Sequence, residues 1–162
     1  MPLSLFKRLL RRLLDWILDH QDNPYHPLVW INGKPIIGMG TYIGGYSEIY
    51  AKGAEVKIGN YCDIASFVVI NCADSSKRCV GLSEAVEKLS ITIGDNVFIG
   101  TQSAILGGTV IGHNSIIGAG VILKKQTIPP YSLVYRDRKS GKLVTTSLSS
   151  NFIKTRRTKS NL

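Results

Sequence analysis

Several residue types that define common classes of protein are scarce in this chain of 162 residues. Its three cysteines, Cys62, Cys72 and Cys79, form no CxxC pair and no Cys/His cluster at metal-ligand spacing. We therefore expect free thiols in a reducing cytoplasm, with Cys62 in the core, and no bound metal. Aromatic residues make up only 8% of the chain, beside 16 glycines. This balance favours tight coils over a β-sandwich.

Long uninterrupted apolar runs are also missing. Basic residues at positions 7, 8, 11 and 12 break the leucine-rich start of the chain, which excludes a secretory signal and a membrane-spanning helix there. The formal net charge is +9, and more than half of the 20 lysines and arginines lie before residue 13 or after residue 135. Because no nucleic-acid-binding module is recognisable, this charge favours an anionic membrane or a phosphorylated ligand over nucleic acid.

Residues 3–20 have the period of an amphipathic helix. At about 100° per residue, the leucines, Phe6, Trp16 and Ile17 cover one half of the circumference, and the charged residues cover the other. Asp22, Asn23 and Pro24 end the pattern. Two interpretations are compatible: the apolar face packs on the first coil or on a neighbouring subunit, or the helix lies on an anionic membrane surface.

The most regular pattern lies in residues 93–125. An aliphatic residue recurs there at every sixth position: Ile93, Ile99, Ile105, Ile111, Ile117 and Leu123. Glycine follows four of the first five: Gly94, Gly100, Gly112 and Gly118. If three hexads close one turn of a parallel β-helix, residues eighteen apart stack, so that Ile93 lies against Ile111. With no Cβ, the glycines would permit the backbone angles of a tight corner.

This run, continued through Thr127–Val134, resembles the hexapeptide-repeat acyltransferases, in particular the sugar and surface-polysaccharide O- and N-acetyltransferases. The resemblance covers roughly residues 28–140. It implies an all-β fold, a left-handed parallel β-helix, together with a homotrimer and acetyl-CoA as the acyl donor. The fold class we expect is this β-helix with an N-terminal amphipathic helix and a basic C-terminal tail.

The repeats suggest three segments: the helix in residues 1–23, the β-helix in 24–135 and the basic tail in 136–162. One large interruption breaks the period. From Ile70 the next hexad begins 23 residues later at Ile93, so residues 72–90 should form an extruded loop. Loops on a rigid scaffold often carry function. In the resembling enzymes a loop at this place helps to form the active site and often supplies a catalytic histidine.

Acetyl transfer needs a base near the acceptor, and histidine suits that role because its ordinary pKa lies near neutrality. No histidine occurs between Asn71 and Thr92, which departs from the relatives with a loop histidine. His113 is the main candidate, because related enzymes hold a catalytic histidine at this third place of a hexad. It could equally belong to a polar corner column, since Asp95 and Asn60 occupy the equivalent positions of earlier coils. Asp74 in the loop is the second candidate base.

The resemblance also implies a donor site along an edge between subunits, formed by backbone amides of the last coils and by basic side chains. Its candidates in this chain are Gly100, Thr101, Gly118 and Ala119 for the backbone contacts, and Lys124 and Lys125 for phosphate. The lysine pair could instead form a solvated corner.

We therefore expect a cytoplasmic homotrimer that transfers acetyl groups from acetyl-CoA to a sugar hydroxyl or amine in surface-polysaccharide synthesis. Peripheral contact with the inner face of the plasma membrane would use residues 3–20. Two alternatives stay open: an N-acetyltransferase for a nucleotide-linked amino sugar, and a non-catalytic trimeric β-helix scaffold. A γ-carbonic anhydrase is disfavoured, because His113 is the only histidine of the repeats.

Overall fold

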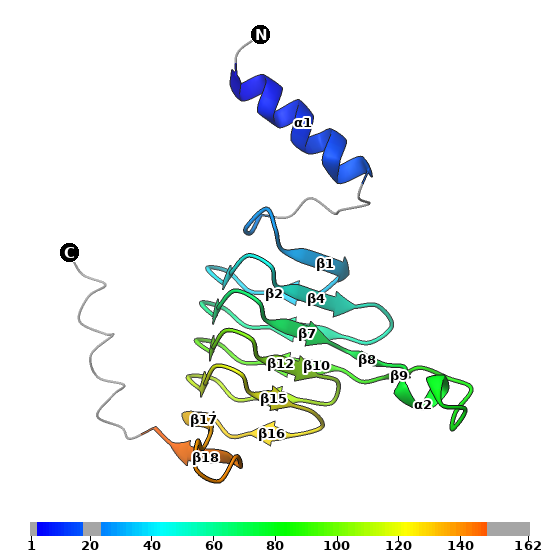
Figure 1. The fold of residues 1–162 in the computed structure, drawn as a ribbon. Helices are drawn as coiled ribbons and strands as arrows, with labels where there is room; N and C mark the ends of the chain where they lie inside the picture. Colours follow the sequence, from blue (N-terminus) through cyan, green and yellow to red (C-terminus); the bar gives the residue numbers. More distant parts are fainter. Residues whose placement is uncertain (1–2, 18–23, 149–162) are drawn as a thin grey trace, which may run out of the picture.

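A computed structural model describes residues 3–17 and 24–148 (Figure 1). Helix α1 (Leu3–Ile17) comes first, and short strands then wind into stacked coils. Three parallel sheets run along the stack and form the faces of a prism. The predicted β-helix and the predicted N-terminal helix are both confirmed. The last three residues of the expected helix, 18–20, and the end of the expected tail, 149–162, lie outside the described residues.

Each coil contributes one strand to each face. Sheet A contains β1 (Trp30–Gly33), β4 (Glu48–Ala51), β7 (Val69–Asn71), β12 (Ala104–Leu106) and β15 (Ile122–Leu123). Sheet B contains β2 (Ile36–Ile37), β5 (Val56–Ile58), β10 (Ile91–Ile93), β13 (Val110–Ile111) and β16 (Thr127–Ile128). Sheet C contains β3 (Tyr42–Ile43), β6 (Asp63–Ile64), β11 (Phe98–Ile99), β14 (Ile116–Ile117), β17 (Ser132–Arg136) and β18 (Leu143–Ser147).

Three corners join these faces, and each collects segments that are far apart in sequence. The AB corner holds residues 34–35, 52–55, 72–90, 107–109 and 124–126. The BC corner holds residues 38–41, 59–62, 94–97, 112–115 and 129–131. The CA corner holds residues 44–47, 65–68, 100–103 and 118–121. Parallel pairing therefore fixes which side chains share a corner.

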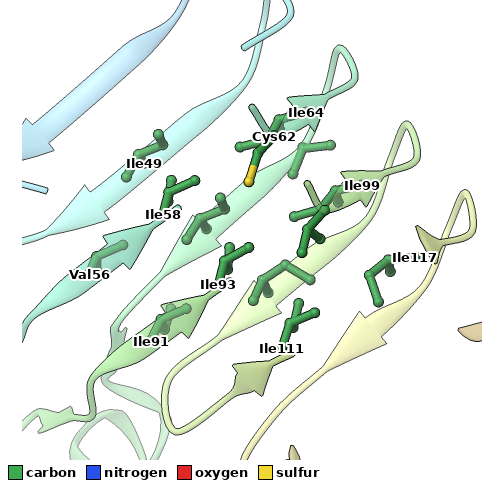
Figure 2. Close-up of a cluster of buried hydrophobic side chains, with 14 of the residues drawn as sticks. Ile49, Val56, Ile58, Cys62, Ile64, Ile91, Ile93, Ile99, Ile111 and Ile117 are labelled. Carbon is green, nitrogen blue, oxygen red and sulfur yellow. The ribbon is translucent and has the colours of Figure 1, made fainter. Parts of the chain in front are cut away.

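The interior is a set of aliphatic ladders (Figure 2). Ile93 pairs with Ile111, Ile99 with Ile117, and Ile105 with Leu123, as the eighteen-residue spacing predicts. All six of these side chains are at most 2% exposed. Burial of an aliphatic side chain of this size contributes about 1.5–3 kcal/mol to folding. The repeated aliphatic position is therefore the main source of the core.

The glycines of the repeat have a different role from the one predicted. Gly94, Gly100 and Gly112 do not have the left-handed backbone angles that favour glycine. Instead, the next coil passes very close to them: a Cβ on Gly94 would lie 2.6 Å from the His113 nitrogen. A Cβ on Gly112 would lie 2.3 Å from the Pro130 nitrogen. Glycine is needed because adjacent backbones meet at these corners.

Small polar side chains bridge adjacent coils from inside the corners. The Thr41 hydroxyl donates to the Gly59 carbonyl oxygen at 2.7 Å and accepts from the Cys62 amide at 3.1 Å. The Ser103 hydroxyl donates to the Gly118 carbonyl oxygen at 2.9 Å. Thr109 differs, because its hydroxyl oxygen is fully buried and has no hydrogen-bond partner within the described part of the chain. A buried hydroxyl without a partner lowers stability.

The carboxyl end of the β-helix is closed by an antiparallel pair. Strand β17 continues past the last coil to Arg136, and β18 returns beside it. The turn between them is stabilised by Asp137, whose carboxylate accepts from the Ser140 amide at 2.8 Å and from its hydroxyl at 2.6 Å. Residues 136–147, which the sequence pattern groups with the basic tail, thus continue sheet C.

Thr109→Val should stabilise the protein by about 1 kcal/mol, because the substitution keeps the branched shape and removes an unpaired buried hydroxyl. Thr41→Val is the matched control, since it removes a hydroxyl that forms two hydrogen bonds, and it should destabilise by about 1–2 kcal/mol. Denaturant unfolding of both variants measures the difference. Equal losses in the two variants would contradict the assignment of Thr109 as unpaired.

Candidate active site

His113 lies at the BC corner, two residues after β13. Its column contains Asn60 and Asp95, as the repeat predicts, and the Asp95 carboxylate accepts from the Asn60 amide at 2.7 Å. The imidazole is exposed and meets the Tyr131 ring edge to face, with 4.9 Å between the ring centres. His113 therefore occupies, in its own coil, the position that Asp95 occupies in the preceding coil, where the Asp95 side chain links two coils.

The hydrogen bond at Nδ1 decides whether His113 can act as a base. The side-chain amide nitrogen of Asn114 lies 2.9 Å from Nδ1. If the amide nitrogen donates to Nδ1, the proton of the neutral imidazole is on Nε2, which then cannot accept another. If the amide is turned so that its oxygen accepts from Nδ1–H, Nε2 is free to take a proton. Only the second arrangement suits a general base, which makes Asn114 the residue that selects the tautomer.

Residues 72–90 leave the prism at the AB corner, between the end of β7 and the start of β10. The loop contains β8 (Ala73–Asp74), the short helix α2 (Ser76–Cys79) and β9 (Glu87–Lys88), and β8 pairs antiparallel with β9. Figure 1 shows it projecting from the side of the prism. Its base is fixed by local hydrogen bonds, in which the Asn71 side chain accepts from the Ala73 amide and Asp74 accepts from the Ser76 amide.

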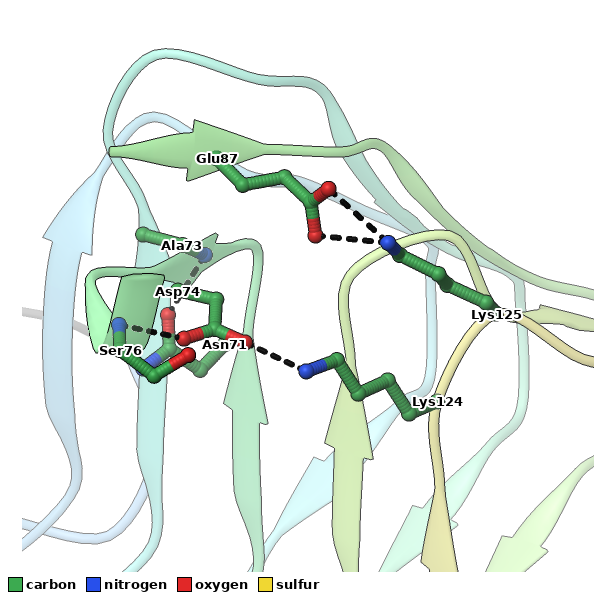
Figure 3. A network of polar contacts seen from close by, with 7 residues as sticks. All are labelled: Asn71, Ala73, Asp74, Ser76, Glu87, Lys124 and Lys125. Carbon is green, nitrogen blue, oxygen red and sulfur yellow. Dashed lines mark hydrogen bonds and ion pairs between the residues drawn. The ribbon is translucent and has the colours of Figure 1, made fainter. Parts of the chain in front are cut away.

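Two ion pairs connect the base of this loop to the last coil (Figure 3). The Lys124 ammonium group donates to the Asp74 carboxylate. The Lys125 ammonium group lies 2.8 Å and 2.9 Å from the two carboxylate oxygens of Glu87. Both lysines predicted to contact phosphate are thus paired within the chain. A phosphate would have to compete with these carboxylates or bind beside them.

A cavity of about 200 Å³ lies at the junction of the loop and the prism. Its lining combines apolar groups with the charged pair of Asp74 and Lys124: Cys72, Ala73, Asp74, Glu87, Leu89, Leu106, Gly107 and Lys124. This volume is below the range of about 300–1,000 Å³ that is usual for small-molecule sites.

Asp74 is a poor candidate for the base in this arrangement. The hydrogen bond from Lys124, and those from the Ser76 hydroxyl and amide, hold the pKa of its carboxyl well below the ordinary value. A carboxylate with a depressed pKa accepts a proton less readily. The ion pair thus makes Asp74 an anchor for Lys124.

The predicted backbone contacts to the donor lie at the CA corner. The amides of Gly100 and Gly118 already donate to the carbonyl oxygens of Ile117 and Val134, at 2.8 Å and 2.7 Å. The backbone hydrogen bonds between coils continue one residue past the strands into the corner. The amides of Gly100 and Gly118 are therefore already paired and cannot bind a donor molecule. Among the described residues, the amides of Thr101 and Ala119 have no acceptor. Of the four residues predicted to bind the donor through their backbone amides, only Thr101 and Ala119 keep an amide that is available for it.

The candidate residues fall into three groups, one at each corner of the prism. His113 lies at the BC corner, Thr101 and Ala119 lie at the CA corner, and Asp74 with the two lysines lies at the AB corner. A prism of packed aliphatic side chains separates the corners. One chain therefore does not bring all three groups to one place.

Comparisons with known proteins, like the coil pattern, indicate a hexapeptide-repeat protein. A sequence model described as "Bacterial transferase hexapeptide (six repeats)" matches residues 90–125. The structure of a hexapeptide-repeat acetyltransferase from Vibrio cholerae is similar to this one, with a TM-score of 0.59 at 26% identity, over 71% of this chain and 63% of that chain. Residues 90–125 thus carry the hexapeptide repeat of bacterial transferases, and the fold resembles that of a hexapeptide-repeat acetyltransferase. The same Vibrio cholerae protein has also been solved with acetyl coenzyme A.

Two further relatives of this hexapeptide-repeat chain differ in what they acylate. A 2,3,4,5-tetrahydropyridine-2,6-dicarboxylate N-succinyltransferase from Xylella fastidiosa is 27% identical over 126 residues, which cover 69% of this chain and 41% of the relative. A structure of a polySia-specific acetyltransferase has a TM-score of 0.59 at 25% identity, over 70% of this chain and 51% of that chain. The chain thus spans about two fifths of the length of the curated relative.

Sequence reasoning did not identify Glu87 or Asn114 as parts of the candidate site of this hexapeptide-repeat protein. The signal for Glu87 was present, because residues 72–90 and 124–126 fall at the same corner when the hexads are counted. Opposite charges on the two segments then predict the pairing. Nothing in the hexad pattern distinguishes Asn114, since its neighbour in the preceding coil is also asparagine, Asn96.

Lys124→Met should raise the pKa of Asp74 toward about 4, its ordinary value, because the principal cause of the depression is removed. In the wild type, the depressed pKa contributes stability above about pH 4 that is lost as the pH falls further. A carboxyl-carbon NMR titration measures the pKa directly. Lys125→Met is the control: it should leave Asp74 unchanged and raise the pKa of Glu87 instead. An unchanged Asp74 pKa in Lys124→Met would contradict the ion pair.

Proposed function

We propose that the protein is a homotrimeric acyltransferase that moves an acetyl group from acetyl-CoA to a sugar hydroxyl or amine in surface-polysaccharide synthesis. One observation carries the proposal. The match to the six-repeat transferase model spans residues 90–125, and every candidate residue except Asp74 lies within it. The acetyl-CoA complex of the Vibrio cholerae protein supports the choice of donor, and the polySia-specific acetyltransferase supports a saccharide acceptor.

The separation of the three corners supports a trimer. Around a threefold axis, one corner of each chain faces a different corner of its neighbour. His113 of one subunit and the CA or AB corner of the next can then form a single site. A short β-helix also leaves its flat faces exposed, and Tyr42, Phe98 and Ile116 on sheet C are 38–55% exposed. Contact with neighbouring subunits would bury these side chains.

In the proposed reaction, His113 accepts the proton of the acceptor hydroxyl as its oxygen attacks the thioester carbonyl. The carbonyl oxygen becomes an oxyanion, which the free amides of Thr101 and Ala119 are suited to stabilise. The tetrahedral intermediate then collapses, the carbon–sulfur bond breaks, and the imidazolium returns its proton to the leaving thiolate. The acetyl ester and free CoA are the products.

N-acylation is the second candidate, because the curated relative from Xylella fastidiosa is an N-succinyltransferase. In this version the acceptor is an amine and the acyl group need not be acetyl. The same residues would act, since an ammonium acceptor must also lose a proton before attack. A nucleotide-linked amino sugar would be an acceptor for N-acylation of this kind.

His113→Ala should retain acetyl-CoA binding in titration calorimetry and lose about 10²–10⁴-fold in acetyl transfer, or in the slow thioester hydrolysis that replaces it without an acceptor. His26→Ala is the matched control, because it removes a histidine from the amino-terminal cap and should leave the rate unchanged. Absence of acetyl-CoA binding by the wild type would favour the scaffold instead. If His113→Ala binds acetyl-CoA and transfers the acetyl group at the wild-type rate, a residue other than His113 must be the base.

A further inference from the structure

Helix α1 exposes a continuous apolar face. Phe6, Leu9, Leu10 and Leu13 recur at helical spacing and are 45–51% exposed. Figure 1 shows the helix beyond the first coil, away from the prism. Four large apolar side chains along one face of a helix form a patch of the kind that marks an interaction site.

The residues just before β1 contact the first coils of the β-helix. Val29 is fully buried beneath the first coil, and its amide donates to the His26 carbonyl oxygen at 2.9 Å. The Leu28 carbonyl oxygen accepts from the Tyr46 amide at 2.8 Å. Residues 25–29 therefore form the cap, and α1 is left available for a partner outside the fold.

The charge on α1 indicates which partner this is. Lys7, Arg8 and Arg12 are exposed on the helix, and no acidic residue precedes Asp15. A helix that packs on protein usually carries charges of both signs on its exposed side. A polar side in which basic residues outnumber acidic ones, beside an apolar face, is instead typical of helices that lie on anionic lipid. The net charge of +9 adds attraction at longer range.

A second copy of α1 is a poorer partner on the same grounds. Both copies would carry the same net positive charge, which opposes their association. Within the described residues, no helix is long and apolar enough to cross a bilayer. The apolar face and the basic side chains beside it are suited to a membrane surface.

We propose that α1 docks the protein onto an anionic lipid surface. The helix lies in the plane of the interface, with Phe6, Leu9, Leu10 and Leu13 toward the acyl chains and Lys7, Arg8 and Arg12 toward the head groups. Docking needs no acyl donor or acceptor, so it stands or fails separately from the proposed transferase activity.

The test is sedimentation of the full chain with vesicles of phosphatidylcholine alone and of phosphatidylcholine with about one third phosphatidylglycerol, without acetyl-CoA. The wild type should bind the anionic vesicles and lose most of this binding in high salt. Leu9→Ser combined with Leu13→Ser should lower the partition coefficient about tenfold or more, because the apolar face is weakened with no change in charge. Lys7→Gln combined with Arg8→Gln should remove the preference for anionic vesicles.

Leu82→Ser is the matched control, since Leu82 is 77% exposed on the loop at the AB corner and should not contribute. Circular dichroism confirms that each variant keeps the β-helix. Failure of the wild type to bind anionic vesicles would overturn the proposal, as would equal binding to both vesicle types. So would an oligomer that dissociates in Leu9→Ser with Leu13→Ser, because the leucines would then join copies of the chain.

Discussion

The structure depends on one constraint, which is the parallel backbone pairing between successive coils. Because each strand pairs with the equivalent strand of the next coil, residues separated by one full turn must lie above one another. A position that is aliphatic in one coil must then be aliphatic in the next, or the ladder leaves a cavity. The same pairing brings the backbones so close at the corners that a Cβ on Gly94 or Gly112 would collide.

This constraint also distributes the chemistry. Among the described residues, the buried polar side chains are all serine or threonine, and the larger polar and charged candidate groups lie at the corners, where each coil turns. The AB corner tolerates the long insertion because the strands before and after it, β7 and β10, keep their places in sheets A and B. Two ion pairs then connect the insertion to the last coil. The cost of this architecture is that His113, the Ala119 amide and Lys124 lie at different corners of one chain.

Much of the fold was predictable because a period of six is visible without any knowledge of partners. The ladder of Ile99 and Ile117 follows from counting. The function of Gly94 was not predictable in the same way, since a glycine that relieves a close approach looks identical in sequence to one that permits an unusual angle. The loop boundaries followed from the broken period, but the pairing of Lys125 with Glu87 needed the corner geometry. The Asn114 contact to His113 depends on side-chain orientation, which periodicity does not encode.

The central claim is that residues from different corners act together only across subunits. The most direct measurement is complementation between two inactive variants, His113→Ala and Ala119→Trp, co-expressed and purified as mixed oligomers. The account predicts that each variant alone is inactive in acetyl transfer and that the mixed oligomers regain part of the wild-type rate, because some interfaces then contain an intact His113 and an intact Ala119. Mixed oligomers that stay as inactive as the separate variants would show that one chain supplies the whole site.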